Sequence, residues 1–146
     1  MLESAQGRGG RKITTGASLA RIGKFVLVGG TGMLVNTAAL VALYQHLHIA
    51  LVAASALATE LAVTNNFVWN NYWTFGQRGF SLRRFARFNA VSLAGQCITI
   101  FTLWALVREG GINYVIANVA GVGLAFTWNF VANARWTWGP TTVRRD

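Results

Sequence analysis

Four long apolar stretches constrain the fold of this chain more than any other feature. Residues 25–47 and 88–107 carry no charge, and each is long enough to cross a hydrocarbon core of about 30 Å as a helix. Residues 51–72 and 114–134 are nearly as apolar and hold one charge, Glu60. Because only 12% of the residues are charged, the chain cannot build the surface of an ordinary soluble domain. We therefore expect an all-α membrane protein with four transmembrane helices. That leaves no room for a catalytic domain and predicts that the chain is not itself an enzyme.

The basic residues are distributed very unevenly among the segments that flank these stretches. Five Lys and Arg precede the first stretch, four lie between the second and third, and three follow the fourth, whereas the two other loops hold only Arg108. By the positive-inside rule this split places both termini and the middle loop in the cytoplasm, as expected for a multi-pass protein of the cytoplasmic (inner) membrane. The net charge of +9 then favours anionic membrane lipids as partners. It does not favour nucleic acid, because the cations form collars at helix ends.

Two segments of the chain have nearly the same sequence. TNNFVWNNYWTFG begins at Thr64, and TWNFVANARWTWG begins at Thr127, 63 residues later. Without a gap, residues 61–76 and 124–139 are identical at ten of sixteen positions. Self-similarity at a fixed offset indicates a duplicated structural unit.

The same offset predicts the organisation of the whole chain. Residues 21–139 form the four-helix transmembrane domain, and its two tandem two-helix repeats are residues 21–76 and 84–139. Residues 1–20 are expected to be a disordered basic tail, and residues 140–146 a second cytoplasmic tail. An even number of crossings leaves both halves in the same orientation, so we expect parallel repeats about an axis along the membrane normal.

The repeated segment places two asparagines and a tryptophan at i, i+4 and i+7, along one stripe of each returning helix. They are Asn66, Asn70 and Trp73 in the first copy and Asn129, Asn133 and Trp136 in the second. In one interpretation the amides bond to neighbouring helices and the tryptophans belong to the interfacial aromatic belt. In the other, the amides bind an anionic head group such as a lipid phosphate, together with nearby cations. The candidate cations are Arg21, Lys24, Arg84 and Arg87.

Glu60 is the only charged residue predicted within the hydrocarbon core. About nine residues separate it from the outer end of its helix, which at 1.5 Å per residue is roughly 14 Å and close to the bilayer centre. An intramembrane carboxyl group is a functional candidate by default. The polar residues expected nearest in depth are Asn36 and, less well matched, Gln96. Glu60 is interpreted either as an acid that exchanges a proton during transport or as a protonated side chain hydrogen-bonded across the bundle.

The sequence indicates neither a metal site nor a cofactor site. His46 and His48 lack the further ligands that a metal needs. The glycines around Gly30 lack the third glycine and the strand of a dinucleotide-binding loop, and close helix packing explains them.

The doubled pattern resembles a known family over residues 21–139. The matching residues are Lys24, Phe25 and Gly29, then Asn66, Phe67, Asn70, Trp73, Thr74 and Phe75. They resemble the GtrA-like family of small four-helix membrane proteins, which is also similar to the membrane domain of some dolichol-phosphate mannose synthases. In that family a basic residue commonly follows the second asparagine, where this chain has Asn71 and Ala134, and here Trp138 replaces the final phenylalanine.

The resemblance implies translocation (flipping) of a polyprenyl-phosphate-linked monosaccharide across the cytoplasmic membrane, for cell-surface polysaccharide synthesis. In that role the asparagines and collar bases bind the phosphosugar head, and Glu60 lines the crossing path. An alternative is a non-transporting anchor or partner of a polyprenyl-phosphate glycosyltransferase. A third is a small proton-coupled multidrug antiporter, against which the charge asymmetry argues. A chain this small has little interior, which favours a homo-oligomer.

Overall fold

The structure is a computed structural model that describes residues 15–139. It contains four α-helices, and within that range it has no strand. The α-helices are α1 (Thr15–Val41), α2 (Leu51–Trp69), α3 (Leu82–Arg108) and α4 (Tyr114–Ala132). Three of them continue into five-residue π-helical turns, η1 (Ala42–His46), η2 (Asn70–Thr74) and η3 (Asn133–Thr137). The expected all-helical fold is confirmed, with four helices long and apolar enough to cross a membrane.

Local sequence signals explain where several of these helices begin and end. Ser81 precedes α3 and its hydroxyl accepts the backbone N–H of Arg84, while Asn113 precedes α4 and accepts that of Val115. Gly76 follows η2 with a φ of 59°, a left-handed conformation that glycine adopts readily. The helix α1 begins at Thr15, so residues 15–20 are helical although the sequence predicts a tail there. Residues 1–14 and 140–146 of the predicted tails lie outside the described residues.

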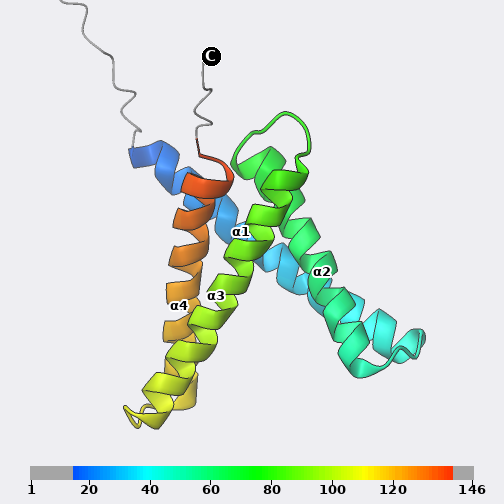
Figure 1. Ribbon diagram of the computed structural model, residues 1–146, viewed down its shortest axis with the longest axis vertical. Helices are drawn as coiled ribbons and strands as arrows, with labels where there is room; N and C mark the ends of the chain where they lie inside the picture. The colour runs from blue at the N-terminus through cyan, green and yellow to red at the C-terminus, as the bar shows by residue number, and fades with distance from the viewer. Residues whose placement is uncertain (1–14, 140–146) are drawn as a thin grey trace, which may run out of the picture.

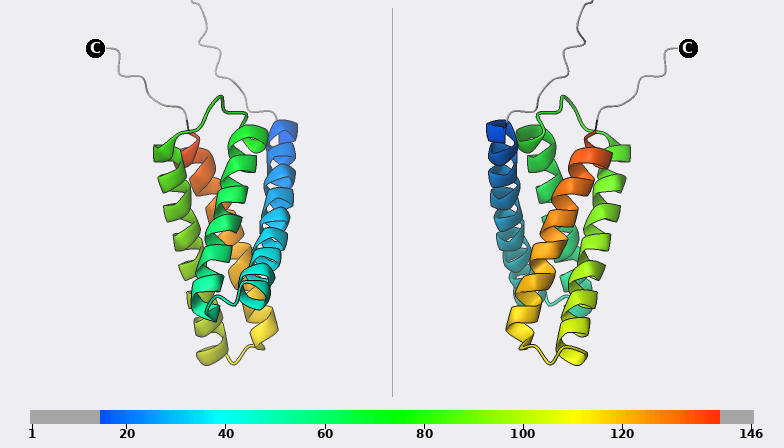
Figure 2. Two further views of the ribbon diagram at one scale, coloured as in Figure 1. Left: turned by 90° about the vertical axis from the view of Figure 1, so that its right-hand side faces the viewer. Right: turned by 90° about the vertical axis from the view of Figure 1, so that its left-hand side faces the viewer.

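The helices form two antiparallel hairpins, α1 with α2 and α3 with α4 (Figure 1). Both α1 and α3 begin, and both α2 and α4 end, at the same end of the molecule (Figure 2). We call this the closed end, because the two hairpins converge there and diverge toward the α1–α2 and α3–α4 connections (Figure 1). The opposite end is called the open end.

Small side chains allow the two helices of each hairpin to pack closely. Three buried small residues recur every fourth position on each returning helix. They are Ala54, Ala58 and Ala62 on α2 and Ala117, Gly121 and Ala125 on α4, each 63 residues apart. A Cβ atom at Gly121 would lie 2.9 Å from the carbonyl oxygen of Thr99 on α3. Helix association inside a membrane depends on such close approach, so each hairpin carries its own packing seam.

Aromatic side chains join the two hairpins at the closed end. Phe67 of α2, Phe88 of α3 and Trp138 form a buried cluster, and the Trp138 ring stacks on Phe75 with centroids 4.2 Å apart. Phe25 of α1 also makes edge contacts with Phe126 and Phe130 of α4. The indole Nε1 of Trp138 donates a hydrogen bond to Oδ1 of Asn71, at 3.2 Å.

The outer surface of the bundle is apolar. Within the most apolar window of each helix, only 11% to 22% of residues are buried inside the chain, and large hydrophobic side chains such as Leu34, Leu93 and Val119 are exposed. A soluble protein rarely exposes apolar surface on this scale, whereas a transmembrane surface facing lipid must do so. The chain is a multi-pass membrane protein.

Candidate functional site

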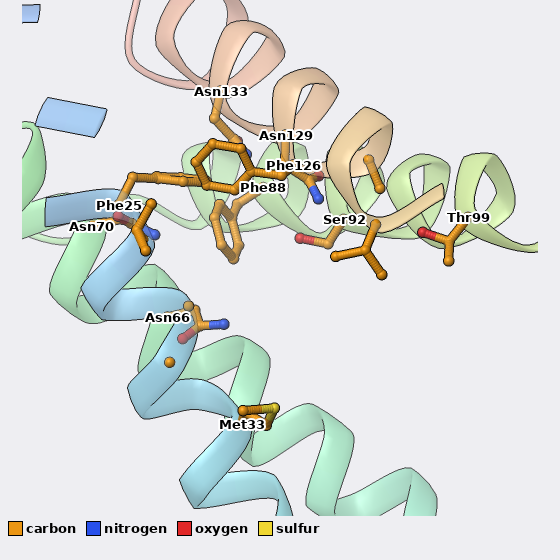
Figure 3. A pocket seen from close by; sticks show the side chains of 15 residues that line it. Phe25, Met33, Asn66, Asn70, Phe88, Ser92, Thr99, Phe126, Asn129 and Asn133 are labelled. Atoms are coloured by element: carbon orange, nitrogen blue, oxygen red, sulfur yellow. The ribbon is translucent and has the colours of Figure 1, made fainter. Parts of the chain in front are cut away.

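A cavity of about 490 Å³ lies between the two hairpins and is lined by all four helices (Figure 3). Its walls are largely apolar and include Val26, Met33, Val122 and Phe126. Its polar groups are the four asparagines that the repeat singled out, Asn66, Asn70, Asn129 and Asn133, together with Ser92 and Thr99. The structure therefore brings both predicted asparagine stripes to one cavity.

Each of the four asparagines has a buried side-chain atom with no hydrogen-bond partner among residues 15–139. Asn70 and Asn133 are buried, with exposed fractions of 2% and 0%, and Asn66 and Asn129 are half-buried. The unpaired atoms are Oδ1 of Asn66, Asn70 and Asn129 and Nδ2 of Asn133. Buried polar groups nearly always have a hydrogen-bond partner. Four such atoms around one cavity are therefore its most unusual feature.

Two glycines make room for the amides of Asn66 and Asn129. The Asn66 amide lies against Gly32 of α1, and a Cβ atom at Gly95 of α3 would be 2.6 Å from Nδ2 of Asn129. In each hairpin the amide thus occupies the space where any larger residue would place its side chain. Figure 3 shows Asn66 and Asn129 extending from different hairpins toward the space between them.

Lys24 and Arg87 do not line this cavity. The Nζ of Lys24 donates to the carbonyl oxygen of Trp73 at 3.3 Å, and Nη1 of Arg87 donates to that of Trp136 at 2.9 Å. Each cation also lies over the ring of the same tryptophan, at 5.3 Å and 5.4 Å from the centroid. Cations are stabilising at the C-terminal ends of helices, where carbonyl groups are unpaired. Both bases thus have a structural role, and both tryptophans stay about half exposed.

The predicted basic residues lie in different places. A second cavity, of about 760 Å³, lies at the closed end of the second hairpin and is lined by Arg83, Arg84, Arg87 and Arg135. Arg21 is exposed and lines neither cavity. The structure therefore separates the predicted head-group site into an amide cavity and a basic cavity.

Arg83 and Arg135 line the basic cavity although no repeated motif includes them. Their counterparts 63 positions earlier are Ala20 and Tyr72, so an analysis of repeated residues passes over them. The available signal was the excess of arginine in the second copy.

Glu60, Asn36 and Gln96 do not line the amide cavity. Glu60 and Gln96 are exposed, and the carboxyl group of Glu60 makes no hydrogen bond with any residue of the described range. Asn36 donates to the hydroxyl of Thr59 at 3.4 Å, one position before Glu60. The separation has a simple cause: six residues at about 100° each turn Glu60 roughly 120° away from Asn66 around α2. Among residues 15–139, no three His, Cys, Asp or Glu side chains are grouped so that they could hold a metal ion.

Comparison with known proteins identifies relatives over most of the chain. Residues 24–138 match the family described as "GtrA/DPMS, transmembrane domain". A dolichol-phosphate mannosyltransferase of Pyrococcus furiosus is 39% identical over 120 residues, which cover 81% of this chain and 34% of that protein. The uncharacterized membrane protein YngA of Bacillus subtilis is 25% identical over 131 residues, covering 89% of this chain and 87% of that protein. The chain thus spans about a third of the length of the first relative.

Proposed function

Because this chain belongs to the GtrA/DPMS transmembrane-domain family, we propose that it translocates a polyprenyl-phosphate-linked sugar across the membrane through the amide cavity. The observation that carries this proposal is the combination of apolar walls and unpaired amide atoms in one cavity between two diverging hairpins. A lipid-linked sugar needs both kinds of surface, since its chain is apolar and its head is polar.

The chemistry of the amides suits a sugar head group. Each asparagine amide has an oxygen that accepts hydrogen bonds and an NH2 group that donates them. Four such amides lining one cavity could therefore bind both the hydroxyl groups of a sugar and the oxygens of a phosphate. Inside hydrocarbon, amide groups of this kind would replace the hydrogen bonds that the head group loses when it leaves water.

The chemistry of the walls suits the rest of the substrate. Polar lining residues include Asn70 and Asn133 at the closed end, where α2 and α4 finish, whereas Met33 and Val122 extend the cavity along the helices. A head group held by the amides would leave its polyprenyl chain in contact with apolar side chains or lipid. We further propose that the closed end faces the cytoplasm, because the basic residues gather there.

The test is translocation of a short-chain polyprenyl-phosphate sugar in liposomes that contain only this protein. The variant is Asn66→Ala with Asn129→Ala, which removes one cavity-lining amide from each hairpin. The matched control is Asn65→Ala with Asn118→Ala, since neither residue lines the cavity. We expect the first variant to slow translocation at least tenfold and the control to change it less than twofold.

A second function is supported by the length of the Pyrococcus furiosus relative. About a third of a protein named dolichol-phosphate mannosyltransferase corresponds to this chain, so the same kind of membrane domain occurs within a longer chain. The alternative proposal is that this chain anchors or orients a separate glycosyltransferase. If folded wild-type protein moves no lipid but co-purifies with such an enzyme and raises its activity, the alternative is correct and the translocation proposal is refuted.

A further inference from the structure

The basic cavity has a composition unlike the rest of the molecule. Among residues 15–139 its lining includes four arginines, together with Ser81, Trp136 and Thr137, and no acidic residue. The described residues contain two acids, Glu60 and Glu109, and these lie within α2 and at the far end of α3. Within the part of the chain that the structure describes, no carboxylate is thus placed to neutralise these guanidinium groups.

Two of the four guanidinium groups are held in place by the protein. Arg84 donates to the carbonyl oxygen of Gly79 at 2.7 Å and to Oε1 of Gln77 at 3.3 Å. Arg87 donates to the backbone carbonyl oxygen of Trp136. Arg83 and Arg135 are exposed, and neither makes a side-chain hydrogen bond or an ion pair with residues 15–139. The cavity thus combines two fixed cations with two whose donors are available to a ligand.

The position of the cavity adds to its positive potential. Ser81 is the N-cap of α3, so the cavity includes the positive end of a helix of 27 residues. Arginine presents planar pairs of N–H donors that match the oxygens of phosphate. With these donors, and with no carboxylate among the described residues that line it, the cavity is complementary to a phosphate oxyanion.

The repeat shows that this cavity is more than a collar of cations that orients the protein in the membrane. Such a collar depends only on the number of Lys and Arg, and both repeats carry bases at the Arg84 and Arg87 positions. Arg83 and Arg135 have no basic counterpart in the first repeat, yet they converge on the same cavity as that pair. Arg83 and Arg135, which occur only in the second repeat, therefore join Arg84 and Arg87 in lining one cavity.

We propose that the basic cavity is a phosphate-ester binding site, separate from the amide cavity and independent of whether the chain translocates lipid. Its volume of about 760 Å³ lies within the range of small-molecule sites, about 300–1,000 Å³, and accommodates a phosphate together with part of the group that it esterifies. The phosphate belongs either to a membrane lipid or to a soluble ester, because the cavity lies at the end of the bundle that leaves the hydrocarbon region.

The experiment measures binding by titration calorimetry with the full chain in a neutral detergent. The two probes are dioctanoyl phosphatidic acid, a lipid phosphate, and glycerol 3-phosphate, its soluble counterpart. The test variant is Arg83→Gln with Arg135→Gln, and the matched control is Arg78→Gln with Arg108→Gln, which removes the same charge outside the cavity. We expect the test variant to bind at least tenfold more weakly and the control less than twofold.

Each outcome decides the proposal. In both supporting outcomes, binding is weakened only in the test variant. Binding of phosphatidic acid alone identifies a lipid as the source of the phosphate. Binding of both probes identifies a soluble ester. The proposal is overturned if neither probe binds the wild type, or if the control weakens binding as much as the test variant. If the double variant does not fold, Arg135→Tyr, which installs the residue found in the first repeat, should weaken binding at least threefold; unchanged binding overturns the proposal.

Discussion

The bond between Trp138 and Asn71 gives the sharpest stability prediction. Asn71 is fully buried, its Oδ1 accepts from the Trp138 indole at 3.2 Å, and its Nδ2 donates to the carbonyl oxygen of Gly79 at 3.1 Å. In Trp138→Phe a smaller ring still stacks on Phe75 but lacks the N–H donor, so among the described residues the Asn71 oxygen is left buried and without a partner. That desolvated acceptor costs about 1–3 kcal/mol. We expect the free energy of unfolding to fall by this amount.

A double-mutant cycle isolates the hydrogen bond from the loss of ring volume. Unfolding is followed by far-UV circular dichroism while a denaturing detergent is titrated into neutral micelles. We compare Trp138→Phe, Asn71→Ala and the double variant, and expect the double variant to be less destabilised than the sum, with a coupling of about 1–2 kcal/mol. The control is Trp104→Phe, since Trp104 is half exposed and makes no side-chain hydrogen bond within the described range. A coupling below about 0.3 kcal/mol would refute the reasoning.

Two further predictions concern single positions in the helices. Gly95→Ala places a Cβ atom 2.6 Å from the amide of Asn129, so we expect a loss of about 1–3 kcal/mol in thermal unfolding. The matched control, Gly123→Ala, has nothing within 4 Å and should be neutral or slightly stabilising; an equal loss in both would contradict the steric explanation. Glu60→Leu should leave unfolding unchanged or stabilise the protein, because Glu60 is exposed and lacks a bond within the described range. A loss above about 1 kcal/mol would show that this carboxyl group has a partner.

The number and length of the helices could be predicted from the sequence because crossing a bilayer requires about 20 apolar residues with all backbone groups paired within the helix. The returning helices end at matched positions, Trp69 and Ala132, because the same residues recur 63 positions apart. The expectation that the asparagines of both copies bind one head group followed from the same repeat. Length and repetition are properties that a linear sequence records directly.

The direction in which Glu60 points could not be predicted. Depth in the membrane follows from counting residues, but rotation about the helix axis needs one face to be more apolar than the other, and α2 is apolar nearly all round. The prediction that Glu60 and Asn36 lie at a similar depth was therefore close, because Asn36 donates a hydrogen bond to Thr59, the residue before Glu60. A helix in lipid gives few sequence clues to its own rotation.

Two of the three departures from the family pattern are hydrogen-bond partners in the structure. Asn71 stands where a basic residue is common, and Trp138 stands where phenylalanine is common, and in the structure the first accepts a hydrogen bond from the second. They are 67 residues apart, so no local rule connects them. Their relation depends on how the two hairpins meet, which the sequence of one chain does not record.

The two packing seams of small residues have a consequence for the connection between the hairpins. Each hairpin buries its own seam, and aromatic contacts such as Phe25 with Phe126 hold the two hairpins together at one end. The linker that joins them, residues 75–81, lies outside both seams, although Phe75 within it stacks on Trp138 of the second hairpin. Close helix packing within each hairpin therefore does not depend on the linker. Two hairpins synthesised separately would each keep their own seam, and their association would depend on the aromatic contacts at the closed end.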